Sequence, residues 1–518
     1  MKQYLVTAEE MKRYDATTIE RFHMPGLLLM ERAALATVEE LQNMYGKTPC
    51  RVLVLAGRGN NGGDGLAVGR LLILQGYEVC FVIPGEKSYE RCTEETRRQI
   101  DILHAYQAQI FSTIQESEYD IVIDALFGIG LSRPVEGIWK DAIQWINRSG
   151  ALVCSVDIPS GIDADTGRIM GCAVKANLTV TYEFCKLGHM LYPGSIHNGK
   201  LICRQMGIDE HSFLSQPPYW YTYTGRESGL LPARPTDGNK GTFGKVLLIA
   251  GSKVIAGAAM MASAGIFRTG AGMVKVVTEA GNRTALQQFI PEAMLLTYTS
   301  RMTAGEEEAF LSALQEAEKW ADCILIGPGI GQEKTARKLL RYVVLQSELP
   351  LVIDADGINI LAGDSGLQDA IAGREKQKRT VILTPHLGEF ARLYGCVVAE
   401  IKENLREYPL KLSERLHCIV VCKDARTIVV QYQGTQGYLN VTGNSGMATA
   451  GSGDVLAGMI TGLLAQGMTG MDAAVAGVYL HGYAGNIAAE KKTEIAMMAT
   501  DIIDCIPDAI KELSKNNL

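Results

Sequence analysis

Apolar residues in the first part of the chain gather in short continuous runs, separated by stretches in which apolar and polar positions recur with helical spacing. Runs this uniformly apolar predict strands buried on both faces, as in a parallel sheet. The clearest of these runs are 51–57, 77–83, 119–128, 151–161 and 177–183. Amphipathic stretches such as 93–106 lie between them and predict crossover helices. The pattern therefore predicts an α/β domain with a doubly wound sheet.

A break in this pattern follows at 214–244, which carries four of the 16 prolines of the chain and keeps no period for long. We expect a linker or extended arm at 216–240, between an N-terminal domain over 1–215 and a C-terminal domain over 241–518. The alternation of strands and helices restarts at 245–251, which predicts a second, different α/β domain. Because 518 residues are too many for one hydrophobic core, the length agrees with two domains.

The composition is that of a globular enzyme, with 47% hydrophobic and 21% charged residues. A net charge of −7 argues against a general nucleic-acid binder. No apolar run reaches the roughly 18 residues of a membrane span, so no membrane partner is expected. Six of the twelve cysteines lie in apolar runs, no C-x-x-C pair occurs, and the first residues are polar and charged. We therefore expect free thiols and a cytoplasmic location.

Glycines and polar residues follow the predicted strands at their carboxyl ends. In the first domain these segments are GRGNNGGDG, DALFGIG and DIPSG, and in the second GPGIG, DADG, TPHLGE and KDART. Ligands of open α/β sheets bind at this edge. Each segment alone is also typical of an ordinary turn, since glycine and aspartate favour turns. Seven such segments at one kind of edge favour ligand sites over turn chemistry alone.

The densest motif is NSGMATAGSGDVLAG at 444–458, a glycine-rich turn that opens a helix. Unpaired N–H groups at a helix start favour a bound anion, and phosphate is the natural one. Asp454 at this start is either a charge that stabilises the helix dipole or a general base that activates a hydroxyl. The chain has no G-x-x-x-x-G-K-[ST] and no protein-kinase motifs, so neither of these classes of phosphoryl-transfer enzyme is indicated.

NSGMATAGSGD resembles the anion-binding motif of the ribokinase-like superfamily, in which the matching aspartate takes a proton from the substrate hydroxyl. The segments GPGIG, VIDADGIN, LTPHLGEFARL and KDART follow in the order typical of the ADP/ATP-dependent NAD(P)H-hydrate dehydratases, and the resemblance covers nearly all of 230–518. It implies a ribokinase-like fold and a reaction in which the hydroxyl of hydrated NADH or NADPH is phosphorylated and then eliminated. The reduced cofactor is thereby restored.

The same resemblance implies the binding residues of this domain. The adenine nucleotide, with magnesium on its phosphates, is expected at Lys423, Asp424, Ala425, Arg426, Thr427 and Gly453. The hydrate is expected at Ala258, Gly329, His386 and Asp454. Two of these have alternatives: His386 as a hydrogen-bonded histidine packing the strand end, and Lys423 as a solvated lysine. KDART does not distinguish ADP from ATP, but the fused arrangement resembles bacterial and archaeal members that favour ADP.

The segment GRGNNGGDG satisfies G-x-G-x-x-G at Gly57, Gly59 and Gly62. A site for an ordinary dinucleotide cofactor also needs an acid about 20 residues later, at the carboxyl end of the next strand. Glu78 has about this spacing, but it begins the next predicted strand and so lies at the wrong edge. The ribose criterion therefore fails.

The polar residues of the segment are Asn60, Asn61 and Asp64, which can hydrogen-bond a ligand or supply hard oxygen ligands to an alkali or alkaline-earth ion. Asp124 and Ser160 end neighbouring strands and can complete such a site. The alternative is an Asn-Gly turn with a capping acid.

GRGNNGGDGLAVGRLL, DALFGIGLSRPVEG and VDIPSGIDADTG together resemble the NAD(P)H-hydrate epimerase family over about 1–215. The resemblance implies substrate contacts at Asn60, Asn61, Asp64, Gly128, Ile129, Gly130, Leu131, Ser132, Arg133, Pro134 and Asp157. It implies a potassium ion at Asn61, Asp124 and Ser160. Asp157 is the candidate acid/base that interconverts the R and S hydrates, and Lys186 is a further polar candidate.

The leading hypothesis is thus a bifunctional repair enzyme that acts on hydrated NADH and NADPH with ADP, and we expect a homo-oligomer. A second hypothesis is a ribokinase-like vitamin or sugar kinase with an accessory nucleotide-binding domain. A third makes the first domain a nucleotide-sensing or partner-binding module without catalysis.

Overall fold

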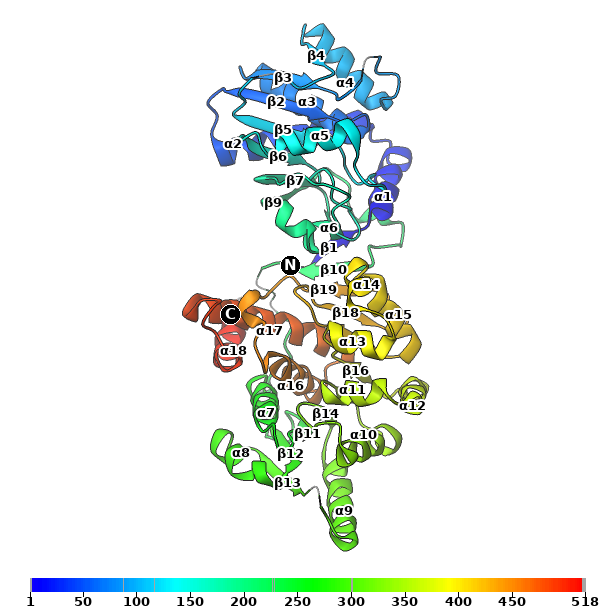
Figure 1. Cartoon of the computed structure of the whole chain (residues 1–518), viewed down its shortest axis with the longest axis vertical. Helices are drawn as coiled ribbons and strands as arrows, with labels where there is room; N and C mark the ends of the chain where they lie inside the picture. The colour runs from blue at the N-terminus through cyan, green and yellow to red at the C-terminus, as the bar shows by residue number, and fades with distance from the viewer. Residues whose placement is uncertain are drawn as a thin grey trace. The chain divides into compact units, whose positions relative to one another are not determined.

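The computed structural model describes residues 2–86, 88–115, 117–225, 227, 229–299 and 301–514. It divides into two compact units (Figure 1). One comprises Gln3–Trp220, and the other comprises Lys2 with the chain from Tyr221 onward. Among the described residues, no helix has the length and apolar character needed to cross a membrane.

The N-terminal unit is built on a seven-stranded sheet in the order β4-β3-β2-β5-β6-β7-β9, and every pair in it is parallel. The strands are β2 (Arg51–Ala56), β3 (Glu78–Val82), β4 (Ile110–Phe111), β5 (Ile121–Ala125), β6 (Leu152–Val156), β7 (Leu178–Tyr182) and β9 (Lys200–Arg204). Strand order reverses between β2 and β5, so the segments that follow these two strands flank the switch point where ligands bind in such folds.

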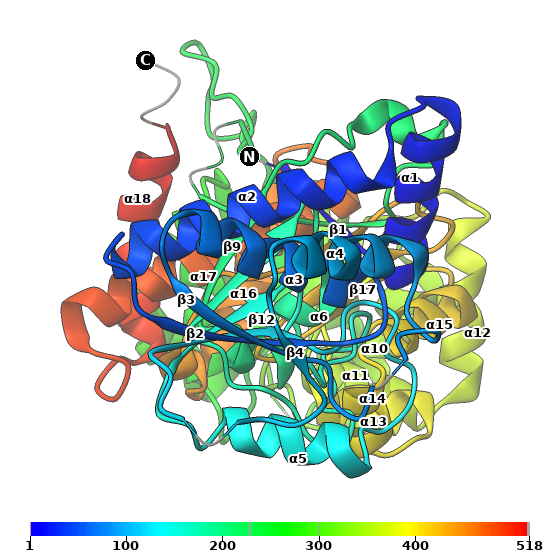
Figure 2. The same ribbon diagram turned by 90° about the horizontal axis from the view of Figure 1, so that it is seen from above.

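Helices cover both faces of this sheet, which explains why its strands are apolar throughout. The helices α2 (Gly26–Tyr45), α3 (Asn60–Leu74) and α4 (Glu94–Ala105) lie on one face, and α5 (Gly137–Ile146) lies on the other (Figure 2). The predicted doubly wound α/β domain is confirmed. Outside this sheet, α1 (Ala8–Arg21) follows β1 (Lys2–Val6), and β1 pairs in parallel with β8 (Cys185–Lys186), which leads into α6 (Leu187–Met190).

The C-terminal unit contains a second sheet with the order β13-β12-β11-β14-β15-β16-β17-β18-β19. Its strands are β11 (Lys245–Ile249), β12 (Met273–Glu279), β13 (Met294–Tyr298), β14 (Cys323–Ile326), β15 (Leu351–Ile353), β16 (Val381–Leu383), β17 (Ile419–Cys422), β18 (Ile428–Gln431) and β19 (Gly437–Leu439). The pairs from β13 to β17 are parallel, whereas β18 and β19 add antiparallel pairs. The order reverses between β11 and β14, which marks the ligand edge of this sheet.

Helices flank the second sheet as well (Figure 1). The buried helix expected near 254–267 is α7 (Gly257–Arg268), which packs on α16 (Ser452–Ala465), and both contact β11. The chain closes with α17 (Gly470–Lys492) and α18 (Ala499–Ser514). The remaining helices are α8 (Arg283–Phe289), α9 (Ala304–Trp320), α10 (Lys334–Gln346), α11 (Asp356–Ala362), α12 (Ser365–Glu375), α13 (Leu387–Tyr394), α14 (Val398–Glu403) and α15 (Glu407–Leu416). The α/β class of this unit is confirmed.

The expected arm at 216–240 contains a strand, β10 (Trp220–Tyr223), and the boundary between the units falls inside it. The aromatic side chains of β10 explain why a strand forms in a segment whose proline and glycine content predicted an irregular arm. The rings of Tyr221 and Tyr223 pack on Tyr438 with centroids 5.4 and 5.5 Å apart. Aromatic residues of this kind favour strands when they find a packing surface.

Candidate active sites

The turn after β2 is shaped by close backbone contacts at two of its glycines. A Cβ atom on Gly57 would lie 1.9 Å from the carbonyl oxygen of Leu126, and one on Gly62 would lie 2.0 Å from that of Gly57. Gly59, by contrast, has open space around it. Glu78 begins β3 and forms an ion pair with Arg51 at 3.0 Å, so it lies at the opposite end of the strand from this turn. The glycines therefore serve strand–helix packing, and the ribose criterion fails in the structure as well.

The three residues expected to bind potassium converge on the turn at 127–128. A Cβ atom on Gly128 would lie 3.1 Å from the Cγ of Asn61, so the two residues are in contact. The Ser160 hydroxyl donates to the carbonyl of Phe127 at 3.2 Å. The backbone N–H of Ser160 donates to Asp124 Oδ2 at 2.9 Å. The amide, carboxylate and hydroxyl groups thus lie around one turn.

Two of these groups are not fully stabilised by the protein around them. Asp124 is completely buried, and this burial raises its pKa even though Ser160 and Ser155 donate hydrogen bonds to it. The Nδ2 of Asn61 is buried and has no hydrogen-bond partner among the described residues. The described residues contain no group of three His, Cys, Asp or Glu side chains fit for a metal, and the set at 127–128 has only one carboxylate. An ion held here would be coordinated mainly by neutral oxygens.

Asp157 follows β6 in a left-handed conformation, with φ of 64°, which is uncommon for a residue with a side chain. Its Oδ1 accepts hydrogen bonds from Lys186 Nζ at 2.5 Å and Thr181 Oγ1 at 3.0 Å. Burial alone would raise the pKa of Asp157, but the charge and hydrogen bond of Lys186 outweigh it and lower the pKa. Asp157 is therefore ionised at neutral pH, and Lys186 is its ion-pair partner.

His189 forms hydrogen bonds with the backbone of both residues of this ion pair. Its Nδ1 accepts from the backbone N–H of Lys186 at 3.0 Å, so the proton of the ring lies on Nε2, 3.0 Å from the carbonyl of Asp157. Burial lowers the pKa of His189 to about 3, so the imidazole is neutral. It is a structural support that the sequence alone did not single out.

Asp64 is a second carboxyl group, and its pKa is shifted in the opposite direction from that of Asp157. Burial, and then the negative charge of Asp157, raise the pKa of Asp64 well above its ordinary value. The unit therefore holds two electrostatically coupled carboxyl groups whose pKa values are shifted in opposite directions. Environments that push two pKa values apart in this way are typical of acid/base pairs.

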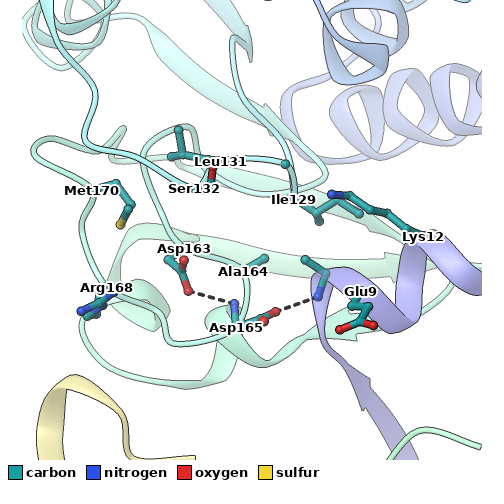
Figure 3. Close-up of a pocket in the computed structure, with 12 residues that line it drawn as sticks. Glu9, Lys12, Ile129, Leu131, Ser132, Asp163, Ala164, Asp165, Arg168 and Met170 are labelled. Carbon is teal, nitrogen blue, oxygen red and sulfur yellow. Dashed lines mark hydrogen bonds between the residues drawn. The ribbon is translucent and has the colours of Figure 1, made fainter.

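The segment Gly128–Pro134 borders a pocket of about 380 Å³ (Figure 3). Ile129, Gly130, Leu131 and Ser132 line it, whereas Arg133 and Pro134 are exposed and lie outside the lining. The opposite walls are Ala8, Glu9 and Lys12 at the start of α1, and Asp163, Ala164, Asp165, Arg168 and Met170. Asp163, Ala164 and Asp165 belong to the segment VDIPSGIDADTG, but the sequence analysis assigned no role to any of these wall residues.

In the C-terminal unit, Asp454 lies in the first turn of α16, which opens after Gly451 in the left-handed region with φ of 90°. Burial and the carboxylates of Asp354 and Glu389 raise the pKa of Asp454 to about 7. A carboxyl group with a pKa near the working pH is well matched to general-base catalysis. The capping alternative does not account for this shift, because a helix N-terminus stabilises the ionised form.

Lys423 directly follows β17 and reaches the same helix start. Its Nζ donates to Asp354 Oδ1 at 2.7 Å, and a Cβ atom on Gly453 would lie 3.1 Å from that Nζ. Only 17% of its side chain is exposed, so the alternative of a solvated lysine is wrong. Burial lowers the pKa of Lys423, but Asp354 and Glu389 outweigh it and raise the pKa, so the cation is kept. Asp354 was missed at the sequence level, although its segment DADG was recognised as a strand-end motif.

His386 is the N-cap of α13 and accepts from the backbone N–H of Gly388 at 3.0 Å through Nδ1. Its Nε2 lies 3.2 Å from Glu389 Oε1, and about half of the side chain is exposed (54%). The histidine is thus hydrogen-bonded, as the alternative expected, but it caps a helix and presents an exposed edge instead of packing the strand end.

The remaining predicted residues lie on neighbouring loops. A Cβ atom on Gly329 would lie 2.9 Å from the Cβ of Ala258, so these two residues are in contact. The loop that carries Gly329 is tied to α11 because Gly331 N–H donates to Asp356 Oδ2 at 2.9 Å. Asp424, Ala425, Arg426 and Thr427 form the connection between β17 and β18 and are exposed or half-buried.

Both units thus place carboxylates, a lysine and glycine-rich turns at the carboxyl edge of a parallel sheet. This arrangement defines a two-domain α/β enzyme with a separate site in each unit. The profile of the NAD(P)H-hydrate dehydratase family matches residues 246–508, and that of the YjeF-related protein N-terminus matches 26–188. The chain belongs to the family of bifunctional NAD(P)H-hydrate repair enzymes.

Relatives match along almost the whole chain. The bifunctional NAD(P)H-hydrate repair enzyme Nnr of Moorella thermoacetica is 34% identical, covering 99% of this chain and 97% of its own length. The protein of the same name from Escherichia coli is 32% identical over 96% and 92% of the two chains. Among solved structures, the ADP/ATP-dependent NAD(P)H-hydrate dehydratase of Bacillus subtilis is 29% identical and covers 55% of this chain and 94% of its own, with a TM-score of 0.44.

Proposed function

We propose that the chain restores hydrated NADH and NADPH in two reactions. The N-terminal unit interconverts the R and S hydrates, and the C-terminal unit phosphorylates the hydroxyl of the S hydrate and eliminates phosphate. The observation that carries the proposal is Asp454 at the start of α16, with a pKa of about 7 and with Lys423 Nζ beside the adjoining Gly453. This is a base and a cation placed where a phosphoryl group and a hydroxyl would meet.

In the dehydratase reaction, Asp454 accepts the proton of the ring hydroxyl as its oxygen forms a bond to the terminal phosphorus of the nucleotide. The bond from that phosphorus to the nucleotide breaks, so ADP leaves as AMP. The phosphorylated carbon then loses phosphate while the neighbouring ring carbon loses a proton, and the double bond is regained. Lys423 and the backbone N–H groups at the start of α16 stabilise the negative charge on the transferring group.

Ala258, Gly329 and His386 contact the hydrate in this proposal, and the 424–427 connection holds the nucleotide. The contact between Ala258 and Gly329 and the exposed edge of His386 support one shared binding surface. Magnesium bound to the nucleotide phosphates would neutralise charge and orient the transferring group. We propose ADP as the preferred nucleotide, tested by comparing initial rates with ADP and ATP.

In the epimerase reaction, Asp157 acts as the base and Asp64 as its protonated counterpart. Asn60 and the 128–134 segment contact the hydrate. The lowered pKa of Asp157 and the raised pKa of Asp64 support this division of roles. Lys186 keeps Asp157 ionised and fixes its carboxylate.

Potassium fits the donors at 127–128, because amide, hydroxyl and carboxylate oxygens suit hard cations. Asn61, Asp124 and Ser160 would hold it, and its positive charge would relieve the desolvation of Asp124. Epimerisation by the wild type should depend on potassium concentration, and Ser160→Ala should raise the concentration needed for half-maximal rate. A rate independent of monovalent cations would contradict this assignment.

One experiment separates the leading proposal from the kinase alternative. The protein is incubated with a mixture of R and S hydrates, ADP and magnesium, and the absorbance of the reduced nicotinamide ring is followed. Complete recovery of NADH from both epimers supports repair, whereas a stable phosphorylated product supports a vitamin- or sugar-kinase type of reaction. Recovery of only half the hydrate would favour a non-catalytic N-terminal unit.

Location and assembly stay proposals. All twelve cysteines are free thiols, which fits the reducing cytoplasm that we propose. The proposed homo-oligomer is tested by sedimentation of the full chain, and a monomeric mass at working concentration would contradict it.

A further inference from the structure

The pocket beside Ile129–Ser132 contains two cationic side chains that the proposed reaction does not use. Lys12 reaches it from α1, and Arg168 comes from the loop after β6 (Figure 3). Both side chains are exposed, and neither the ammonium of Lys12 nor the guanidinium of Arg168 has an interaction partner in the part of the chain that the structure describes. Figure 3 shows the Lys12 side chain extending from the helix toward the Ile129 segment.

Two carboxylates of the pocket, Asp163 and Asp165, accept hydrogen bonds from backbone N–H groups of the pocket walls. Asp163 Oδ1 accepts from the backbone N–H of Asp165 at 3.1 Å and of Thr166 at 2.8 Å. Asp165 Oδ1 accepts from the N–H of Ala8 at 2.7 Å, which ties this loop to the start of α1. In Figure 3 the carboxylate of Glu9 points away from the ammonium of Lys12. Neither cation is paired with these carboxylates, which line the same pocket.

The pocket is joined to the Asp157 site through its wall. The N–H of Gly188 donates to the carbonyl of Ala164 at 2.7 Å, and a Cβ atom on Gly188 would lie 2.3 Å from the carbonyl oxygen of Asp163. Gly188 is two residues from Lys186, the partner of Asp157. The pocket wall is therefore packed directly against the segment that follows Lys186. The volume of about 380 Å³ lies within the range of roughly 300 to 1,000 Å³ of small-molecule sites.

We propose that this pocket binds the diphosphate group of the hydrated dinucleotide, with Lys12 and Arg168 as its two cationic contacts. The inference rests on the proposed epimerase function and adds the residues that recognise the non-reacting part of its substrate. A diphosphate is the part of that substrate whose charge matches two unpaired cations. Because these contacts are the same for the ground and transition states, they govern substrate affinity more than turnover.

The test compares Lys12→Gln and Arg168→Gln with Lys47→Gln, an exposed lysine outside the pocket. For epimerisation of hydrated NADH, each pocket variant should raise KM about tenfold with kcat within about twofold of the wild type. Lys47→Gln should leave both unchanged. With the hydrate of reduced nicotinamide riboside, which has no phosphate, wild type and variants should have equal kcat/KM.

A KM for hydrated NADH that stays within twofold in both pocket variants would overturn the proposal. An equal loss with the phosphate-free substrate would also overturn it. Calorimetric titration with inorganic diphosphate supplies a measurement that does not depend on epimerisation. The wild type should bind it about tenfold more tightly than either pocket variant, and equal affinities would overturn the inference. If the wild type binds diphosphate in this way but fails to epimerise the hydrates, the proposed function falls and the anion site stands.

Discussion

Lys423 and Asp354 form a buried ion pair, with Nζ 2.7 Å from Oδ1, at the edge of the sheet where α16 begins. Asp354 is 1% exposed, and its Oδ1 also accepts from Thr384 Oγ1 at 2.7 Å. The pair holds the ammonium group beside Gly453. Its two charges act in opposite directions on Asp454, because Asp354 raises the pKa of Asp454 and Lys423 lowers it.

The first prediction uses these opposite effects. Asp354→Asn should move the midpoint of the pH–rate profile of dehydration to lower pH, and Lys423→Met should move it to higher pH. Both variants should lose at least about tenfold in kcat/KM, because the cation is either released or removed. Removing one partner of a buried pair also destabilises a fold by about 3–5 kcal/mol, so the rates are measured at a temperature where circular dichroism shows both variants folded. Shifts in the same direction would contradict this account of Asp454.

A second prediction concerns pH and Asp454 itself. Because the base must be ionised, kcat/KM for dehydration should rise about tenfold per pH unit up to about 7 and then level off. A pKa raised from 3.8 means that the folded state binds the proton more tightly than the unfolded state. The contribution of Asp454 to stability therefore falls as pH rises from about 4 to 7. Asp454→Asn should be more stable than the wild type at pH 8, by about 1–3 kcal/mol in urea unfolding.

The third prediction separates the two units. Asp454→Asn should lower dehydration by at least about a thousandfold and leave interconversion of the R and S hydrates unchanged. Asp157→Asn should have the reverse effect, sparing dehydration of the purified S hydrate. Chiral chromatography of the hydrates and the absorbance of NADH measure the two activities on the same samples. Loss of both activities in either variant, with the fold intact, would contradict two independent sites.

A fourth prediction tests Lys186 as the group that keeps Asp157 ionised. In the wild type the lowered pKa of Asp157 should leave epimerisation independent of pH between about 5 and 8, as far as this residue is concerned. Lys186→Met removes the charge that outweighs burial, so the pKa of Asp157 should rise and the acid limb of the profile should move toward neutral pH. Lys186→Arg keeps the charge and should restore most of the wild-type profile. If the methionine variant lost rate without any change in the profile, a purely structural role would be indicated.

The fifth prediction compares two glycines of the same turn. Gly62→Ala places a Cβ atom 2.0 Å from the carbonyl oxygen of Gly57, whereas Gly59→Ala meets nothing within 4 Å. We expect Gly62→Ala to destabilise the N-terminal unit by at least about 3 kcal/mol and to abolish epimerisation. Gly59→Ala should cost less than about 1 kcal/mol. Equal midpoints of thermal unfolding would contradict the packing role of Gly62.

The two α/β units could be predicted because their buried strands leave a continuous apolar pattern that needs no partner to be recognised. The start of α16 at the GSGD turn, and the start of α3 at NNGGD, follow from local glycine and polar patterns for the same reason. By contrast, β10 escaped prediction, because its strand character depends on the tyrosines of a distant segment, Tyr438 among them.

The sequence by itself determined the fold class and the two sets of strand-end motifs, since hydrophobic periodicity and turn-forming residues act over a few positions of the chain. Tertiary structure decided which charged groups meet. Asp354 and Lys423 are 69 residues apart, and Asp157 and Lys186 are 29 apart. Their pairing depends on which segments after the strands approach one another in the folded chain, and their pKa values depend on burial. Neither the pairing nor the burial can be inferred from local residue patterns. The pocket between α1, Ile129–Ser132 and Arg168 likewise depends on segments that are distant in the sequence.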